Sequence, residues 1–126
     1  MLIIIIFSFL GQPSRPNELS FIMNTVKSSM TLRWRTPSQE ENGGAAIQCY
    51  KVSLYTEGHF KHHSCFPRSR LYERNGYTHL IGYRVRYYGW AIIELKAVNK
   101  LGDGFTSTIN VTFIQDVDNA SYTGNV

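Results

Sequence analysis

The sequence predicts an all-β fold, a sandwich of about seven antiparallel strands, from two patterns. Short segments in which every second residue is apolar alternate with turn-forming residues at the intervals typical of a β-sandwich. No stretch shows the i, i+3, i+4 apolar spacing of a long helix. A chain of 126 residues, 43% of them hydrophobic, suits one domain with a substantial core, so we expect a single sandwich and no helix-based motif.

Residues 1–11 precede this domain and begin with the most apolar run of the chain, MLIIIIFSFL. Ten residues of helix span only about 15 Å, half of a bilayer's hydrocarbon core, so the run is not a complete transmembrane helix. It has the length of the apolar part of a secretory signal, but no Lys or Arg precedes it, and bulky Phe9 stands where the peptidase prefers a small residue. A signal remnant, a truncated membrane segment and an artefactual start all stay open.

Pro13 and Pro16 bracket the polar stretch that follows. Proline cannot donate to a sheet ladder, so it suits a lead-in or an edge strand. We therefore divide the chain into an apolar segment at 1–11, one domain at 12–115 and a flexible C-terminal tail at 116–126.

Alternation also predicts which side chains face the core. In the segment around Trp34, for example, Arg33 and Arg35 lie on the face opposite the tryptophan. The residues expected to face inward are Leu19, Phe21, Met23, Met30, Leu32, Trp34, Tyr50, Val52, Leu54, Ala91, Ile93, Leu95, Ala97, Ile109, Val111 and Phe113. The predicted centre of the core comprises Trp34, Tyr50, Val52, Leu95 and Ala97.

Three motifs occur in an order and at separations that resemble the fibronectin type III family over about residues 13–114. They are Pro13 and Pro16 followed by Trp34-Arg35-Thr36-Pro37, then Gly43-Gly44 followed by Ile47-Gln48-Cys49-Tyr50-Lys51-Val52, and last Leu95-Lys96-Ala97-Val98-Asn99-Lys100-Leu101-Gly102-Asp103-Gly104 followed by Ser107. The last motif resembles the family's sixth strand, its Ala-x-Asn and the Gly-x-Gly loop into the final strand. The resemblance implies an immunoglobulin-like β-sandwich and a module without enzymatic activity.

Two features depart from the family pattern. The family usually has a tyrosine six residues before the alanine of Ala-x-Asn, where its hydroxyl ties a chain crossing to the backbone. This chain has Ala91 there, with Tyr88 and Trp90 nearby, so either a neighbour takes over the role or the crossing is held more weakly. The segment 58–76 is longer and more basic than the family's usual connection, and the sequence does not assign its strand register.

Positive charge gathers in residues 59–86, which hold six Lys or Arg and one acid, whereas the whole chain has a net charge of +4. Such a patch attracts acidic polymers, and several modules of the family that this chain resembles bind heparin through Arg and Lys clusters. A sulfated glycosaminoglycan is therefore a candidate ligand of Lys61, Arg68, Arg70, Arg84 and Arg86. The alternative is a solvated loop whose charge is incidental. Nucleic acid is not expected, since no recognition helix or stacking motif accompanies the charge.

Cys49 and Cys65 are too few for a disulfide scaffold and lack the spacing of a zinc or redox motif. Cys49 points away from the presumed core, so a cross-strand disulfide forms if Cys65 lies close to it on the following strand, and two free thiols are the alternative. His59, His62 and His63, with Cys65, are residue types that bind zinc, but their spacing matches no closed site. We expect exposed loop histidines, no metal and no cofactor.

Asn110-Val111-Thr112 and Asn119-Ala120-Ser121 are glycosylation triplets, and Asn110 falls on the polar face of its predicted strand. Asn110 and Asn119 are therefore glycosylation candidates. Leu101-Gly102-Asp103 occupies the loop in which some family members carry an integrin-binding Arg-Gly-Asp, but Leu101 stands where that contact needs arginine. We expect this loop to serve only as a turn.

No arrangement of residues points to catalysis, because the acids are dispersed and there is neither a nucleophile elbow nor a phosphate-binding glycine loop. We expect a protein-binding, adhesion or spacer module of a larger extracellular or receptor protein, at or outside the cell surface. The alternative is an intracellular structural repeat of a muscle or cytoskeletal protein, in the cytoplasm. In both cases the protein partner is unknown, and any membrane attachment comes through the parent protein.

Overall fold

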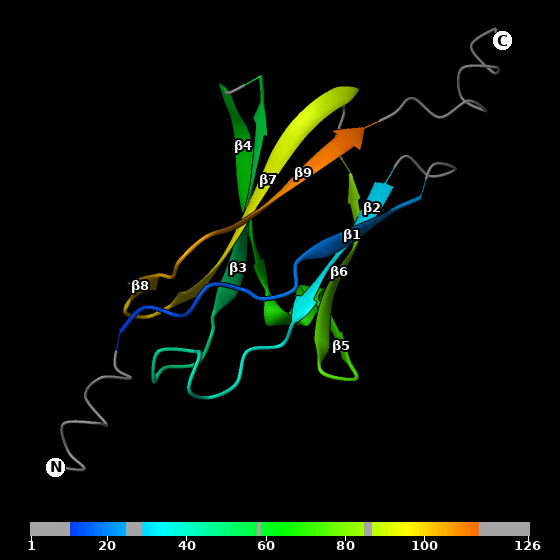
Figure 1. Cartoon of the computed structure of the whole chain (residues 1–126). Helices are drawn as coiled ribbons and strands as arrows, with labels where there is room; N and C mark the ends of the chain where they lie inside the picture. The colour runs from blue at the N-terminus through cyan, green and yellow to red at the C-terminus, as the bar shows by residue number, and fades with distance from the viewer. Residues whose placement is uncertain (1–10, 25–28, 58, 85–86, 114–126) are drawn as a thin grey trace, which may run out of the picture.

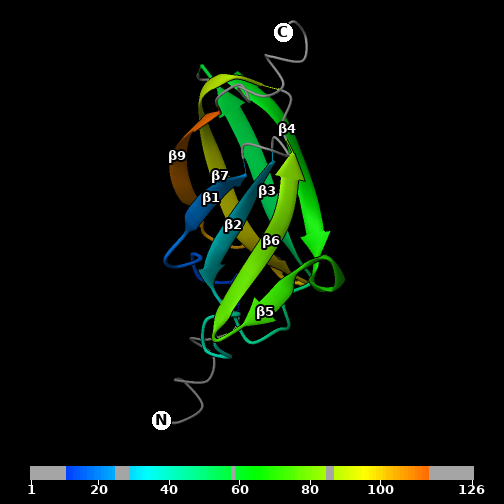
Figure 2. The ribbon, with the colours of Figure 1, turned by 90° about the vertical axis from the view of Figure 1, so that its right-hand side faces the viewer.

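The computed structural model describes residues 11–24, 29–57, 59–84 and 87–113, which form two antiparallel β-sheets facing each other (Figure 1). The first sheet has the strand order β1-β2-β6-β5, and Figure 2 shows these strands side by side. In that order the strands comprise Ser20–Asn24, Ser29–Arg35, Tyr77–Arg84 and Tyr72–Arg74.

The second sheet has the order β4-β3-β7-β8, and β9 pairs with the remainder of β7. In that order the strands comprise His59–Pro67, Cys49–Thr56, Gly89–Asn99 and Gly102–Asp103, with β9 at Ser107–Phe113. A short 3-10 turn, η1 at Arg68–Arg70, connects β4 to β5. Within the described residues, seven strands are five residues or longer and two are shorter, so the predicted sandwich of about seven antiparallel strands is confirmed.

The core lies between the sheets and follows the alternation of the strands. Trp34 on β2 is fully buried, and its ring centroid lies 4.8 Å from that of Tyr50 on β3. All five residues predicted at the centre of the core are at most 3% exposed. Phe21 and Met23 are only partly buried, because β1 is the outermost strand of this sheet among the described residues.

The chain enters the sandwich through residues 11–17, which lie between two loops. On one side, Phe105 N donates to Pro13 O over 3.2 Å, and the hydroxyl of Ser107 donates to Pro16 O. On the other side, Ser14 N donates to a carbonyl of the loop between β2 and β3 over 2.8 Å. The prolines thus take part as acceptors only, which is what a lead-in at the edge of a sheet allows.

Asn99, at the end of β7, holds this lead-in against the loops. The residue is 2% exposed, and its Nδ2 donates to Gly11 O over 2.8 Å and to Asn42 O over 2.9 Å. Its Oδ1 accepts the N–H groups of Leu101 at 2.8 Å and Gly102 at 3.1 Å. Since both ends of the amide are satisfied, its burial carries little penalty, and the asparagine of the Ala-x-Asn motif joins three segments of the chain.

Gly43 and Gly104 lie where the lead-in approaches other backbone too closely for a side chain. A Cβ atom at Gly104 would overlap Pro13 O, and one at Gly43 would overlap Gly11 O. Gly43 also has a φ of 80°, a conformation that favours glycine. The turn glycines in the sequence therefore mark contacts with the N-terminal lead-in as well as turns.

The segment 58–76 contains β4, η1 and β5. β4 pairs with β3 from His59, opposite Thr56, to Pro67, opposite Cys49, with a bulge between Leu54 and Tyr55. β5 then pairs with β6 in the other sheet. The chain thus crosses from the second sheet to the first at η1.

The crossing into β7 is tied by Tyr87 rather than by the residues beside it. Tyr87 Oη donates to Trp90 O over 3.1 Å. Ala91 is fully buried, while Tyr88 and Trp90 are about half exposed. A neighbouring tyrosine therefore supplies a hydroxyl-to-backbone bond, but this bond spans only three residues along the chain.

Candidate functional site

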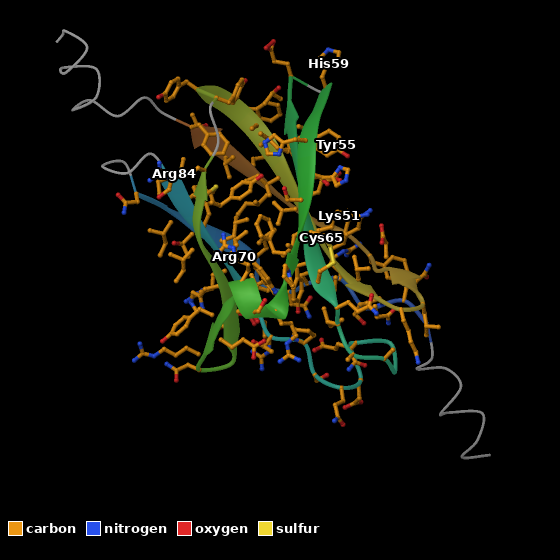
Figure 3. All side chains as sticks on the ribbon, turned by 180° about the vertical axis from the view of Figure 1, so that it is seen from behind. Lys51, Tyr55, His59, Cys65, Arg70 and Arg84 are labelled. Atoms are coloured by element: carbon orange, nitrogen blue, oxygen red, sulfur yellow. A yellow bond between two sulfur atoms is a disulfide. The ribbon has the colours of Figure 1, made fainter. Side chains whose placement is uncertain are left out.

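Cys49 and Cys65 form a disulfide across β3 and β4, with their Cα atoms 5.6 Å apart. Cys65 lies opposite Lys51 and Cys49 opposite Pro67, so the bond connects the two strands diagonally. Cys65 is exposed and Cys49 is half-buried, which places the bond on the outer face of the second sheet (Figure 3). The chain therefore presents an oxidised pair to solvent.

The histidines beside this bond do not converge on one point. His62 and His63 are exposed and consecutive on β4, so their side chains project from opposite faces of the strand. His59 begins the same strand. Within the described ranges, no group of three or more His, Cys, Asp or Glu is placed to hold a metal ion.

The described arginines of the segment 59–86 lie on three elements, η1, β5 and β6. Arg68 on η1 pairs with Glu73, its guanidinium 3.4 Å from the carboxylate, and Arg70 lies over the ring of Phe66 at 5.8 Å. Arg84 ends β6, away from η1 (Figure 3). The side chain of Lys61 and the whole of Arg86 lie outside the described residues.

Asn110 lies exposed on the outer face of β9, opposite Ile92 of β7. Thr112, the third residue of the triplet, is exposed two positions further on the same face. The triplet is therefore accessible in the folded domain. Asn119 lies outside the described residues.

Ion pairs within the domain fix the position of the loop that contains Leu101 and Asp103. Asp103 accepts Lys51 Nζ at 2.9 Å and lies 3.4 Å from Lys96 Nζ. The hydrogen bond from Lys51 is the main cause that lowers the pKa of Asp103 below its ordinary value. The aspartate thus has a structural role on the outer face of the second sheet.

The outer face of the first sheet carries cationic and aromatic side chains from three strands. Arg33 and Arg35 of β2 lie opposite His79 and Tyr77 of β6, which in turn lie opposite Tyr72 and Arg74 of β5. We call these six residues the Arg–Tyr face. The sequence placed Arg33 and Arg35 on an outer face but gave no sign of their partners, because those partners are about forty residues away in the chain.

Tyr77 is the centre of this face. Its ring lies 4.3 Å from the guanidinium carbon of Arg33, a cation–π contact. Its hydroxyl donates to Glu18 Oε1 over 2.8 Å, and Arg35 donates to Glu18 Oε2 over 3.2 Å. These two hydrogen bonds, that of Tyr77 first, lower the pKa of Glu18 below its ordinary value.

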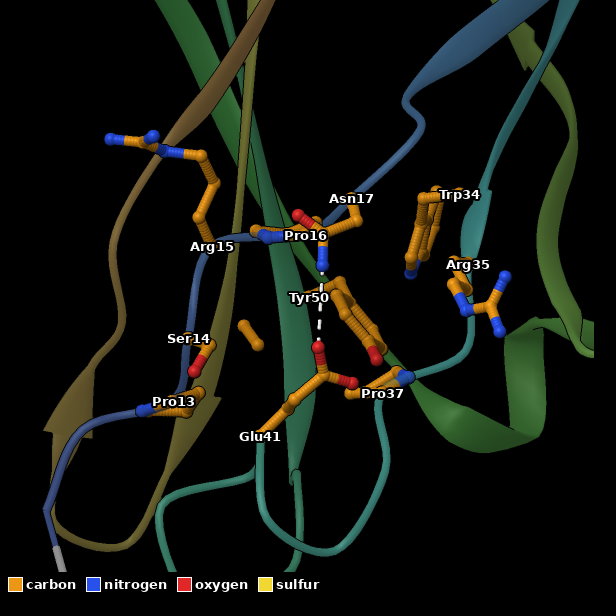
Figure 4. Close-up of a pocket in the computed structure, with 11 residues that line it drawn as sticks. Pro13, Ser14, Arg15, Pro16, Asn17, Trp34, Arg35, Pro37, Glu41 and Tyr50 are labelled. Carbon is orange, nitrogen blue, oxygen red and sulfur yellow. Dashed lines mark hydrogen bonds between the residues drawn. The ribbon is translucent and has the colours of Figure 1, made fainter. Parts of the chain in front are cut away.

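The hollows in the described part of the molecule are small or shallow. A cavity of about 10 Å³ under the lead-in is bordered by Trp34 and Tyr50 and bridged by a hydrogen bond from Asn17 Nδ2 to Glu41 (Figure 4). It has room for a water molecule at most. A second hollow of about 250 Å³ lies between the β2–β3 loop and η1, below the usual size of a ligand pocket, roughly 300–1,000 Å³. A third, of about 460 Å³ between Glu18 and Thr106, is a shallow depression that is open to solvent.

Two antiparallel sheets in this order, closed over one core, define the class: an immunoglobulin-like β-sandwich with a fibronectin type III-like fold. Among solved structures, the chain is similar to the third fibronectin III domain of human KIAA0343 protein, with a TM-score of 0.56 and 12% identity over 83% of this chain and 85% of that one. It is also similar to part of the twitchin kinase region from C. elegans, with a TM-score of 0.53 and 20% identity.

That second match covers 83% of this chain and 17% of the twitchin chain. No protein-family model and no curated protein matches the sequence. At these identities the similarity shows the fold alone, and one fold can host many functions. Within the described residues there is also no helix long and apolar enough to cross a membrane.

Proposed function

We propose that this chain is a non-enzymatic, protein-binding or adhesion module of a larger protein that acts outside the cell or at its surface. The observation that carries the proposal is the exposed disulfide between Cys49 and Cys65. Disulfides persist in oxidising compartments and are rare in the cytosol. The accessible triplet at Asn110 supports the same setting, because N-glycans are added in the secretory pathway.

Expression in a secretory host tests this proposal. We expect secreted protein whose mass falls on treatment with an N-glycosidase. Asn110→Gln and, independently, Thr112→Val should abolish the part of the mass shift that comes from this triplet, while Asn119→Gln serves as the matched control at the other triplet. Protein that is retained inside the cell and carries no glycan would contradict an extracellular role.

The alternative is a spacer repeat of an intracellular muscle or cytoskeletal protein, which the same fold permits. The flanking gene sequence discriminates between the two. Tandem immunoglobulin-like repeats next to a kinase would favour the intracellular repeat, whereas a signal peptide and a membrane span would favour the extracellular module. The disulfide favours the second outcome.

A sulfated glycosaminoglycan is a second candidate ligand, supported by the exposed Arg68 and Arg70 on η1. Guanidinium groups bind sulfate through paired hydrogen bonds. We expect salt-sensitive retention on heparin that falls on substitution of Arg68, Arg70 and Arg84 by alanine. Elution at low salt, unchanged by these substitutions, would contradict binding of a sulfated glycosaminoglycan.

A further inference from the structure

The Arg–Tyr face already holds one carboxylate. The carboxylate of Glu18, just before β1, accepts hydrogen bonds from the Tyr77 hydroxyl at 2.8 Å and from Arg35 at 3.2 Å. Its φ is 56°, a left-handed conformation that residues with a side chain adopt only at a cost. The backbone at Glu18 is thus held in an unfavourable conformation while its carboxylate occupies this face.

The interactions of Glu18 with Tyr77 and Arg35 are weak enough for another carboxylate to replace them. The side chains of Arg35 and Glu18 are 59% and 52% exposed. An ion pair this open to water contributes little to stability, so a competing carboxylate can take the place of Glu18. Tyr77 and Arg35 therefore form a carboxylate site with an internal occupant.

The positive charge of the surrounding face favours an acidic ligand. Among the described residues that point outward from β1, β2, β6 and β5, four are arginines, Arg33, Arg35, Arg74 and Arg84, and none is acidic. Tyr72 is 49% exposed, and its ring lies 5.8 Å from that of His79. The face thus combines unbalanced positive charge with accessible aromatic rings.

The next row of the same face is apolar. Ile22 of β1 and Ile81 of β6 are 70% and 56% exposed, and they flank Thr31 on the intervening strand. A polypeptide that carries both carboxylates and apolar side chains complements both rows at once. A sulfated polysaccharide matches the cationic row but has no apolar side chain for the isoleucines.

We propose that the Arg–Tyr face docks an acidic, partly apolar segment of a protein partner, one of whose carboxylates takes the place of Glu18 on Tyr77 and Arg35. The proposal rests on the proposed function as a protein-binding module and names the chemistry of the partner. Arg33 and Arg74 bind further carboxylates of the partner, and Ile22 and Ile81 contact its apolar side chains.

The full chain is tested by fluorescence anisotropy with a short labelled peptide of Glu-Glu-Leu repeats, and in parallel with a labelled heparin oligosaccharide. We expect the double variant Arg33→Gln, Arg35→Gln to weaken peptide binding by at least about ten-fold, since close charge pairs across interfaces contribute on this scale. The control, Arg70→Gln with Lys100→Gln, removes the same charge from exposed positions outside the four strands of this sheet and should leave binding within about two-fold. Arg74→Gln should give a second, independent decrease.

Glu18→Gln is the variant that distinguishes an internal occupant from plain charge. It should tighten peptide binding by roughly two- to five-fold, the equivalent of a surface ion pair, and by more than Glu40→Gln, which makes the same charge change in the exposed β2–β3 loop. Thermal unfolding of each variant verifies that the fold is kept.

Three results would overturn the proposal: equal binding losses in the face variant and its control, no peptide binding at all, or binding of heparin without binding of the peptide. The last result would identify a polysaccharide surface instead. The disulfide state of the same sample, measured by mass, separates these failures from a failure of the extracellular proposal, because an intact disulfide supports the latter whatever the peptide does.

Discussion

At the scale of single residues, Trp34 anchors the contact between the sheets. Its side chain is fully buried, and its ring packs against that of Tyr50 in the opposite sheet. Trp34→Ala should lower the free energy of unfolding by about 3–5 kcal/mol, the usual cost of emptying a large aromatic site. Urea denaturation measures this loss, with Trp90→Ala, half exposed, as a control expected to cost under about 1 kcal/mol. Similar losses in the two variants would mean that the core is misplaced.

Tyr83 is a buried residue with an unsatisfied polar group. It is 6% exposed, its ring packs edge-on against Phe66 at 6.1 Å, and its hydroxyl has no hydrogen-bond partner among the described residues. Burial raises the pKa of Tyr83 to about 12, because an apolar site disfavours the phenolate. The folded state therefore holds this proton to a higher pH than the unfolded chain does.

The consequence is a loss of stability in alkali. An unfolded tyrosine ionises near pH ~10, so the free energy of unfolding should fall as the pH rises from there towards about 12. Tyr83→Phe should remove much of this fall and, by deleting an unpartnered hydroxyl, raise stability at neutral pH by about 1 kcal/mol. Urea denaturation across this pH range, with the exposed Tyr88→Phe as control, measures both effects. An unchanged alkaline slope in Tyr83→Phe would contradict this assignment.

At the scale of elements, β4 is an edge strand of the second sheet that the disulfide joins to β3. The two cysteines are 16 residues apart, and closing a loop of about that length stabilises a fold by roughly 3 kcal/mol. Replacing Cys49 and Cys65 by alanine should therefore lower the free energy of unfolding by about this amount. The reduced natural sequence is the control and should match the double variant. A loss below about 1 kcal/mol would show that β4 is held without the bond.

The strands that alternate clearly could be predicted from sequence, because alternation decides which face is buried. The alternation around Trp34, Tyr50 and Leu95 places these side chains in the core with no knowledge of their neighbours. The segment 58–76 could not be assigned in this way. Its register depends on pairing with β3 on one side and β6 on the other, and on a bulge, none of which leaves a local signal.

The candidate surfaces show the same limit. A count of charge along the chain selects residues 59–86, whereas the folded sheet brings Arg33 and Arg35 beside Tyr77 and separates Arg84 from η1. Likewise, the tyrosine that ties the crossing into β7 is Tyr87, a position that the family spacing does not indicate. Cross-strand neighbours, rather than residue types, decide these sites.

At the scale of the whole molecule, the two outer faces differ in character. The second sheet presents the disulfide, Asn110 and the lysines paired with Asp103, while the first sheet presents the Arg–Tyr face. A glycan on Asn110 would extend from the second sheet and leave the first sheet open. A module arranged in this way can be glycosylated and bind a partner at the same time.

The redox state of the two cysteines in the protein's own cells tests the extracellular role most directly. Cells are lysed in a thiol-alkylating reagent, and the intact mass is measured with and without prior reduction. We predict no label on Cys49 and Cys65 before reduction and one label on each after it, since the pair is a disulfide. Both cysteines labelled without reduction would mean a reducing compartment and would contradict the proposal of an extracellular module.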